Sequence, residues 1–295
     1  MSIRILLLGS KGIVGSEISK HISDNYDVRS YGHKDLDITD FDLIDNRVRE
    51  FSPNIIINSA AYTQVEEAEN NKSLCYDVNS YAIKNLSELC NSYKIQLIHL
   101  STDYIFDGKQ NHPYTESDSG APINVYGDSK NRGDEYIKSS GCNYIILRTS
   151  WVYGLNGNNF VKKILERSLS NDKLEIVCDQ FGTPTSSYLI ADIIKNHLLQ
   201  YCIEKKNDSF KEIFNLCSTG YTSWFNFAKY IIKHSSNINP KYTADLISIT
   251  TENYKTKAKR PKYTALSNQK ICAYFDINIQ NWEYYLERFL DNFID

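Results

Sequence analysis

The chain has 295 residues, of which 41% are apolar and 23% are charged, and its formal net charge is −3 at pH 7. This length can bury a sizeable core, and the composition excludes a disordered or fibrous protein. No basic stripe offers the surface that nucleic-acid binding needs, and the one lysine-rich stretch, Lys255–Lys262, is interpreted as a solvated loop.

The spacing of the cysteines and the apolar run near the N-terminus indicate in which cellular compartment the protein is expected. The seven cysteines are odd in number and none is spaced Cys-x-x-Cys, which argues against both a disulfide framework and a zinc site. The apolar run Ile3–Leu8 is too short to cross a membrane and lacks a signal-peptide cleavage pattern. We therefore expect a cytoplasmic protein without a membrane segment or a nucleic-acid partner.

Short apolar runs alternate with longer amphipathic stretches through the first half of the chain. Runs rich in Ile, Leu and Val, each followed by a helical pattern, are typical of parallel strands covered by helices on both faces. The sequence therefore predicts an α/β fold with a doubly wound, mostly parallel Rossmann sheet, whose ligands bind at the carboxyl ends of the strands. The expected strands are Ile3–Leu8, Asp27–Ser30, Ile55–Asn58, Gln96–Ser101 and Tyr144–Arg148, and the clearest helical patterns are Ser73–Ser92 and Ser129–Ser139.

The pattern changes beyond Trp151. A Gly/Asn segment precedes a helical stretch over Phe160–Leu169, and α/β segments return at Leu189–Tyr201 and Ile213–Leu216. From Ser218 the chain carries three aromatic-rich helical patterns and few strands. We expect a dinucleotide-binding domain over residues 1–150, with returning segments near 175–217, and a smaller, mostly helical C-terminal substrate lobe over residues 151–174 and 218–295.

A glycine-rich turn follows the first expected strand and opens the first helix. Its pattern, Gly-x-x-Gly-x-x-Gly, is a variant of the dinucleotide fingerprint. The first glycine permits a tight turn, the second lets the backbone approach a pyrophosphate, and the third lets the helix pack on the strand. The helix N-terminus then presents unpaired N–H groups to the phosphates. The residues expected to bind the cofactor here are Gly9, Lys11, Gly12, Ile13, Val14 and Gly15.

The end of the second expected strand bears on the choice of cofactor. An acidic residue there would bind the ribose 2′-hydroxyl of NADH, but the sequence reads Tyr-Gly-His-Lys before Asp35. His33 and Lys34 are suited to a 2′-phosphate, so NADPH is the expected cofactor, with NADH as the alternative. Asp37 and Ile38 are expected to flank the adenine.

Tyr126 and Lys130 are spaced i, i+4, which places a phenol and an ammonium on one helix face. A nearby cation, together with an oxidised nicotinamide, favours the phenolate and lowers the pKa of a tyrosine. About 24 residues upstream, Thr102 ends a predicted parallel strand, where its hydroxyl can donate to a carbonyl oxygen. A hydroxyl, a phenol and a lysine around a nicotinamide form a site for carbonyl reduction.

With these motifs the chain resembles the extended short-chain dehydrogenase/reductase superfamily, and more closely the dTDP-4-dehydrorhamnose reductase family. The resemblance runs essentially from end to end. It implies an NADPH-dependent oxidoreductase that reduces a nucleotide-linked 4-keto-6-deoxy sugar, dTDP-4-dehydro-L-rhamnose, for cell-surface polysaccharide. The matching stretches are Gly9–Gly15, Asn58–Thr63, Ser101–Phe106, Asn124–Lys130, Arg148–Gly154, Asn158–Phe160, Asp179–Thr185 and Arg260–Pro261.

The resemblance also implies roles for particular residues. Thr102, Tyr126 and Lys130 would be catalytic. Tyr126 and Lys130 would also contact the cofactor, Lys130 at the nicotinamide ribose. Further cofactor contacts would be Ala60, Ala61, Tyr62 and Asn79. Beside Thr102 and Tyr126, the implied substrate contacts are Thr63, Asp103, Trp151 and Arg260. For Trp151, core packing is the alternative.

One position departs from the family. Some members bridge a dimer through Mg²⁺ held by carboxylates; Glu17 is retained here, but Tyr188 stands where the second carboxylate is expected. A neutral phenol is a poor ligand for a hard cation. We therefore expect no metal site, and either a monomer or a homodimer.

Two other functions remain open at this stage. The first is a nucleotide-sugar dehydratase or epimerase, although dehydratases place Asp-Glu after the threonine and here Asp103 and Tyr104 follow Thr102. The second is a non-catalytic, NADP-binding regulatory homologue, because a fold alone does not establish activity.

Overall fold

The computed structural model describes residues 3–170, 173–205 and 208–294. Its centre is a six-stranded sheet with the order β10-β5-β4-β3-β1-β2, in which every neighbouring pair is parallel. The strand ends agree with the predicted ends to within one residue for the first five strands, and the predicted α/β fold class is confirmed. The strands are β1 (Arg4–Leu8), β2 (Asp27–Tyr31), β3 (Ile55–Asn58), β4 (Gln96–Thr102), β5 (Tyr144–Thr149) and β10 (Lys211–Asn215).

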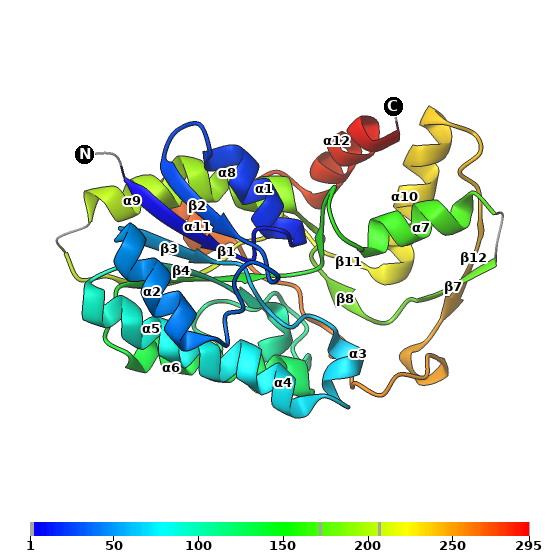
Figure 1. Cartoon of the computed structure of the whole chain (residues 1–295). Coiled ribbons are helices and arrows are strands. Elements are labelled where there is room, and N and C mark those ends of the chain that lie inside the picture. The colour runs from blue at the N-terminus through cyan, green and yellow to red at the C-terminus, as the bar shows by residue number, and fades with distance from the viewer. Residues whose placement is uncertain (1–2, 171–172, 206–207, 295) are drawn as a thin grey trace.

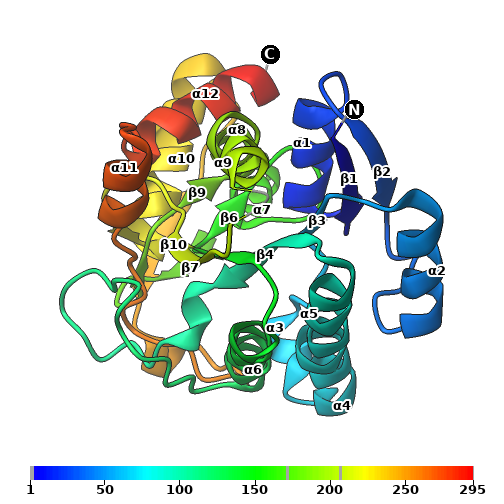
Figure 2. The same cartoon turned by 90° about the vertical axis from the view of Figure 1, so that its left-hand side faces the viewer.

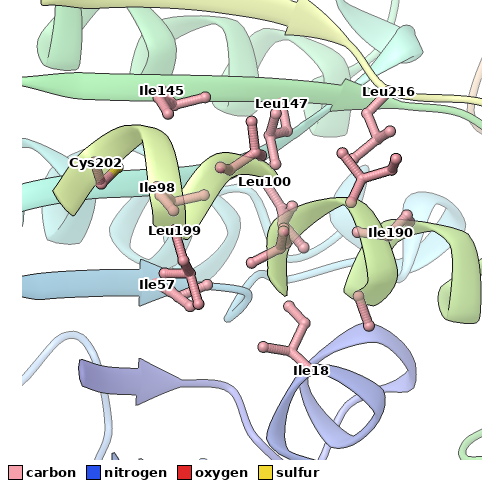
Figure 3. Packing of buried hydrophobic residues seen from close by; sticks show 14 of the residues in the cluster. Ile18, Ile57, Ile98, Leu100, Ile145, Leu147, Ile190, Leu199, Cys202 and Leu216 are labelled. Atoms are coloured by element: carbon pink, nitrogen blue, oxygen red, sulfur yellow. The ribbon is translucent and has the colours of Figure 1, made fainter. Parts of the chain in front are cut away.

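Helices cover both faces of the sheet, as Figure 2 shows with α8 and α9 above it and α5 and α6 below it. On one face Ile18, Ile190 and Leu199 pack onto strand residues such as Ile98 and Ile145 (Figure 3). The adjacent residues of each strand point to the other face, where a second cluster forms. The helices on the first face are α1 (Ile13–Ile22), α8 (Ser187–Ile193) with the π-helical turn Ile194–Leu198, α9 (Leu199–Glu204) and α11 (Gln269–Phe275); those on the second are α2 (Phe41–Phe51), α5 (Ala82–Tyr93) and α6 (Val125–Ser139).

The single helix expected over Ser73–Ser92 contains a π-helical turn. It consists of α4 (Lys72–Tyr76), the π-helical turn Asp77–Tyr81 and then α5. The short α3 (Val65–Ala68) precedes it, after the loop that follows β3. The extra residue of a π turn changes the direction of the side chains before it, and such turns are frequent at functional sites.

A smaller group of elements lies beside the sheet, at the right of Figure 1. Its core is aromatic and includes Tyr153, Phe227, Trp282 and Phe289. The elements are α7 (Phe160–Ser168), α10 (Trp224–Ile238), α12 (Trp282–Ile294), the parallel pair β7 (Lys173–Val177) and β12 (Asp245–Ile249), and the two-residue strands β6 (Val152–Tyr153), β8 (Phe181–Gly182), β9 (Thr185–Ser186) and β11 (Thr222–Ser223).

The expected domain boundaries stay a prediction. Ile271 and Ile279, which lie in the segment expected in the substrate lobe, pack in the first cluster of the sheet. The chain therefore returns from the aromatic core to the sheet before α12. Within the described ranges, no helix is both long and apolar enough to span a membrane.

Candidate active site

The glycine turn between β1 and α1 keeps its backbone uncovered by side chains. Gly9 has φ +79°, and a Cβ built on it would lie 2.5 Å from the backbone nitrogen of Ala60. A Cβ on Gly15 would lie 2.2 Å from the Gly9 carbonyl oxygen, so α1 packs directly on the turn. Gly12 is the N-cap residue of this ten-residue helix and has no side chain to cover the first N–H groups. The turn therefore offers a cradle of amides to an anion.

A second part of the expected cofactor site lies at the end of β2. Lys11 is exposed, and its Cγ would lie 2.5 Å from a Cβ on Gly32. The side chain of His33 is 81% exposed and its Nδ1 lies 3.9 Å from the carboxylate of Asp37. Ile38 is buried in the second cluster, and its contact with the adenine stays a prediction. The nitrogen-bearing side chains of Lys11 and His33 therefore both lie beside the residues that follow β2.

The loop after β3 is held by side-chain amides. Asn58 Oδ1 accepts from the Ala60 N–H at 3.1 Å. Asn79, on the π-helical turn, accepts from the Tyr62 N–H at 2.9 Å, and its Nδ2 donates to the Tyr62 carbonyl at 3.0 Å and to Ser129 Oγ at 3.1 Å. Asn79 thus ties this loop to α6, and the expected contacts Ala61 and Thr63 lie on the same loop.

Thr102 and Tyr126 meet where β4 ends and α6 begins. Asn124 caps α6 by accepting from the Gly127 N–H at 2.8 Å, which fixes the first turn that carries Tyr126. Burial raises the pKa of Tyr126 well above its usual value, and the neighbouring Thr102 hydroxyl lowers it in part. The direction is opposite to the lowering that the Tyr–Lys spacing predicts, because the site is almost closed to water.

Lys130 lies one helical turn after Tyr126 and is 2% exposed. Its Nζ donates to the Leu100 carbonyl at 2.6 Å and lies 3.2 Å from His99 Nε2. Burial lowers the pKa of Lys130 to about 8, against a smaller opposite effect of Asp134. The Lys130 ammonium therefore loses its proton at a pH only slightly above neutral.

The carboxylate of Asp103 is enclosed by hydroxyl groups. Its Oδ1 accepts from Thr102 Oγ1 at 3.1 Å and its Oδ2 accepts from Ser150 Oγ at 2.8 Å. Burial raises the pKa of Asp103 to about 6, although hydrogen bonds from Thr264, Ser150 and Thr102 oppose that rise. Both oxygens are engaged inside the protein, and the role of Asp103 as a substrate contact stays a prediction.

Arg260 reaches the site from the loop after β12. Its Nη1 donates to the Tyr104 hydroxyl at 2.8 Å, and its Nη2 pairs with Glu66 Oε1 at 2.7 Å. The Tyr104 ring in turn lies edge-to-face against Tyr126, with 5.7 Å between centroids. Glu66 also accepts from the Lys257 N–H at 2.9 Å, so α3 holds this loop over the phenol. No motif in the sequence pointed to Glu66, since its partners lie about 190 residues away.

Trp151 lies at the junction between β5 and the aromatic core. Its backbone has φ +46°, and its ring stacks on Trp224 with 3.5 Å between centroids and 6° between planes. Trp224 thus covers one face of the ring, and Gly182 lies against its Cε2. Core packing, the alternative for Trp151, therefore accounts for much of its surface.

A cavity of about 700 Å³ opens beside this stack. Its wall combines aromatic rings with cations and carboxylates. The lining includes Phe160, Lys163, Glu166, Arg167, Glu175, Gln180, Trp224, Tyr254 and Arg260.

Glu17 and Tyr188 lie together on the face formed by α1 and α8. Glu17 pairs with His21 at 3.5 Å, and the His21 ring lies edge-to-face on Tyr188 with 5.2 Å between centroids. Over the part of the chain that the structure describes, no three His, Cys, Asp or Glu side chains are grouped as a metal site.

Comparison with known proteins gives consistent results. The family model described as the RmlD substrate binding domain matches residues 3–294. Two relatives named dTDP-4-dehydrorhamnose reductase are similar over nearly the full length: one from Aggregatibacter actinomycetemcomitans at 36% identity (95% of this chain, 96% of the relative) and one from Sinorhizobium fredii at 34% (95% and 94%). A solved dTDP-4-dehydrorhamnose reductase from Bacillus anthracis, in complex with NADP, superposes with a TM-score of 0.90 at 31% identity and covers 99% of this chain and 100% of that one.

Proposed function

The chain belongs to the family of the RmlD substrate binding domain, and on this premise we propose that it uses NADPH to reduce dTDP-4-dehydro-L-rhamnose to dTDP-L-rhamnose. It is an oxidoreductase that acts on the 4-keto group of a nucleotide-linked 6-deoxy sugar. One observation carries the proposal: the Thr102 hydroxyl lies beside the Tyr126 phenol, one helical turn before Lys130, at the sheet edge that also holds the glycine turn.

The residues around the glycine turn fit a dinucleotide. A Cβ on Gly9 or Gly15 would fill the cradle, and the N-terminus of α1 offers its amides to the pyrophosphate. Lys11 and His33 suit a 2′-phosphate, in line with the NADP bound by the relative from Bacillus anthracis. When bound, the reduced nicotinamide supplies the hydride.

Tyr126 serves as the acid. Because burial raises the pKa of its phenol, the side chain holds its proton at neutral pH and can give it to the oxygen of a carbonyl under reduction. When the substrate binds, the Thr102 hydroxyl turns its proton from Asp103 to the same oxygen as negative charge develops there. A raised pKa therefore suits the reductive direction, in which the site begins each cycle with a protonated phenol.

The cavity beside α7 and α10 suits the nucleotide of the substrate. Trp224 and Phe160 offer aromatic faces to a base, and Lys163 and Arg260 offer cations to a diphosphate. Arg260, on the wall of this cavity, also contacts Tyr104, which lies against Tyr126. We assign the aromatic group of elements to the substrate lobe on this basis.

The residue after Asp103 argues against a dehydratase. Elimination needs a carboxylic acid there, but Tyr104 occupies the position and its hydroxyl accepts from Arg260. The glutamate that such dehydratases place after the aspartate is therefore absent from this chain.

The proposal is tested by the oxidation of NADPH with dTDP-, CDP- and GDP-linked 4-keto-6-deoxy sugars. Rapid turnover is expected with dTDP-4-dehydro-L-rhamnose, and product stereochemistry by NMR completes the assignment. Tight NADPH binding without turnover of any of the sugars would instead identify a non-catalytic homologue.

A further inference from the structure

A directional chain of hydrogen bonds leads from the loop after β3 to Lys130. It begins at the Ala60 N–H, which, as a backbone amide, can only donate. Its acceptor at 3.1 Å is Asn58 Oδ1, and this fixes the orientation of the Asn58 amide. The other end of that amide, Nδ2, is a donor and lies 3.0 Å from Nδ1 of His99. His99 Nδ1 must therefore accept.

The protonation of His99 follows from that contact. The ring is fully buried, and burial together with the charge of Lys130 lowers its pKa well below the usual value, so the imidazole is neutral. A neutral imidazole carries one proton, and with Nδ1 accepting it lies on Nε2. Nε2 lies 3.2 Å from Lys130 Nζ and 3.9 Å from Asp134 Oδ1. The Nε2–H thus points toward a lysine nitrogen that can accept it only as an amine.

The side chains around Lys130 determine which group accepts the His99 Nε2–H when Lys130 gains a proton. They are His99 on β4, Tyr126 and Asp134 on α6, and Cys75 on α4. Asp134 Oδ2 accepts from Ser101 at 2.7 Å, whereas its buried Oδ1 accepts no hydrogen bond from the described residues. When Lys130 is an ammonium, this free oxygen is the remaining acceptor for the Nε2–H.

We infer that His99 is a positioning residue for Lys130: oriented by Asn58, it directs its Nε2–H at Nζ and keeps the amine form of the lysine accessible beside the cofactor. The inference rests on the proposed function and on the contact with the nicotinamide ribose that the family resemblance implies for Lys130. It adds a link from the Ala60 loop, through two buried side chains, to the lysine. The position of the proton on His99 thereby depends on both the Ala60 loop and Lys130 of α6.

Two substitutions separate the contacts of His99. His99→Asn retains a polar group near the position of Nδ1, within reach of Asn58, and removes the group that faces Lys130. His99→Gln retains a polar group near the position of Nε2 and removes the one that faces Asn58. The readout is the dissociation constant of NADPH, measured from about pH 6 to about pH 10. The midpoint of its pH dependence reports the pKa of Lys130. Thermal unfolding of both variants tests whether each is folded.

The wild-type midpoint is expected near pH 8. In His99→Asn it should rise by about one pH unit, because the donor that disfavours the ammonium is gone, while in His99→Gln it should stay near the wild-type value. The reverse result, with His99→Asn unchanged and His99→Gln displaced, would show that the ring serves only Asn58 and would overturn the inference.

The wild-type enzyme provides an independent measurement. With ¹⁵N-labelled histidine, the resonance that disappears in His99→Asn belongs to His99, and its nitrogen shifts identify the protonated atom; in case that variant does not fold, His99→Gln gives the same assignment. We expect Nε2 protonated and Nδ1 unprotonated throughout the neutral range. A proton on Nδ1 would refute the inference even in an enzyme with full turnover, and the expected tautomer in an inactive protein would count against the proposed function alone.

Discussion

The carboxyl edge of the sheet and the aromatic lobe hold their functional groups by different means. At the edge, Gly9, Thr102 and Lys130 come directly from strand ends and a helix start, and backbone geometry places them. In the lobe, Trp151 and Trp224 find each other only through packing of distant segments. In the proposed function the edge carries the reacting groups and the lobe binds the nucleotide sugar, so substitutions in the two regions should have different kinds of effect.

The largest effect is expected at the edge, from Tyr126→Phe. Removal of the phenolic proton should lower kcat by about 10²-fold or more, while the dissociation constant of NADPH stays nearly unchanged. Single-turnover oxidation of NADPH measures the step directly. Near-normal turnover would remove the phenol from the mechanism and with it the distinction between the two regions.

Asp103 lies where the regions meet, and its titration should appear in the stability. Its pKa is 3.8 when unfolded and about 6 when folded, so the folded state binds the proton more tightly. The stabilisation from this group is full below pH 3.8 and is lost as the pH rises through about 6, a change of about 3 kcal/mol. Urea unfolding across this range should show that the stability of the wild type falls more steeply with pH than that of Asp103→Asn, by this amount. Equal slopes would place the carboxylate in contact with water.

Two glycines of the turn should separate folding from cofactor binding. Gly9→Ala forces a Cβ against Ala60 at positive φ, and we expect a loss of stability of about 2 kcal/mol or more. Gly12→Ala is the matched control, because its Cβ would lie 3.4 Å from the nearest atom, Gly9 O; stability should change little, while NADPH affinity falls about tenfold. Denaturant unfolding and fluorescence titration measure the two effects. Unaltered NADPH affinity in Gly12→Ala would mean that the phosphates bind elsewhere.

The smallest effect is expected in the lobe. Trp224→Ala should raise KM for the nucleotide sugar about tenfold, with kcat at saturation and NADPH affinity close to wild type. Trp224→Phe keeps an aromatic face and should recover most of the loss. A fall in kcat with unchanged KM would show that the lobe acts on the chemical step, contrary to the comparison above.

The two regions also differ in how much the sequence revealed. The five strands and the glycine turn were predictable, because apolar runs and turn residues encode them locally. Thr102, Tyr126 and Lys130 were predicted from spacing and resemblance, and the structure brings them to one edge. The raised pKa of Tyr126 was not predictable, since it depends on how tightly neighbouring segments close over the ring.

The lobe was less accessible to such reasoning. The pairing of β7 with β12 joins strands separated by more than sixty residues, and neither has a continuous apolar run. The clamp of Glu66 on Arg260 and the contact of His99 with Lys130 are likewise long-range and leave no spacing pattern. Only the folded chain shows these partners.

The π-helical turn Asp77–Tyr81 has an evolutionary consequence. Such a turn holds one residue more than an α-helix of the same length, and deletion of that residue would rotate everything before it by about 100° relative to α5. Asn79 could then no longer face both Tyr62 and Ser129. Deletion of a single codon from this helix would therefore loosen the loop after β3, so the helix tolerates a change of side chain more readily than a change of length.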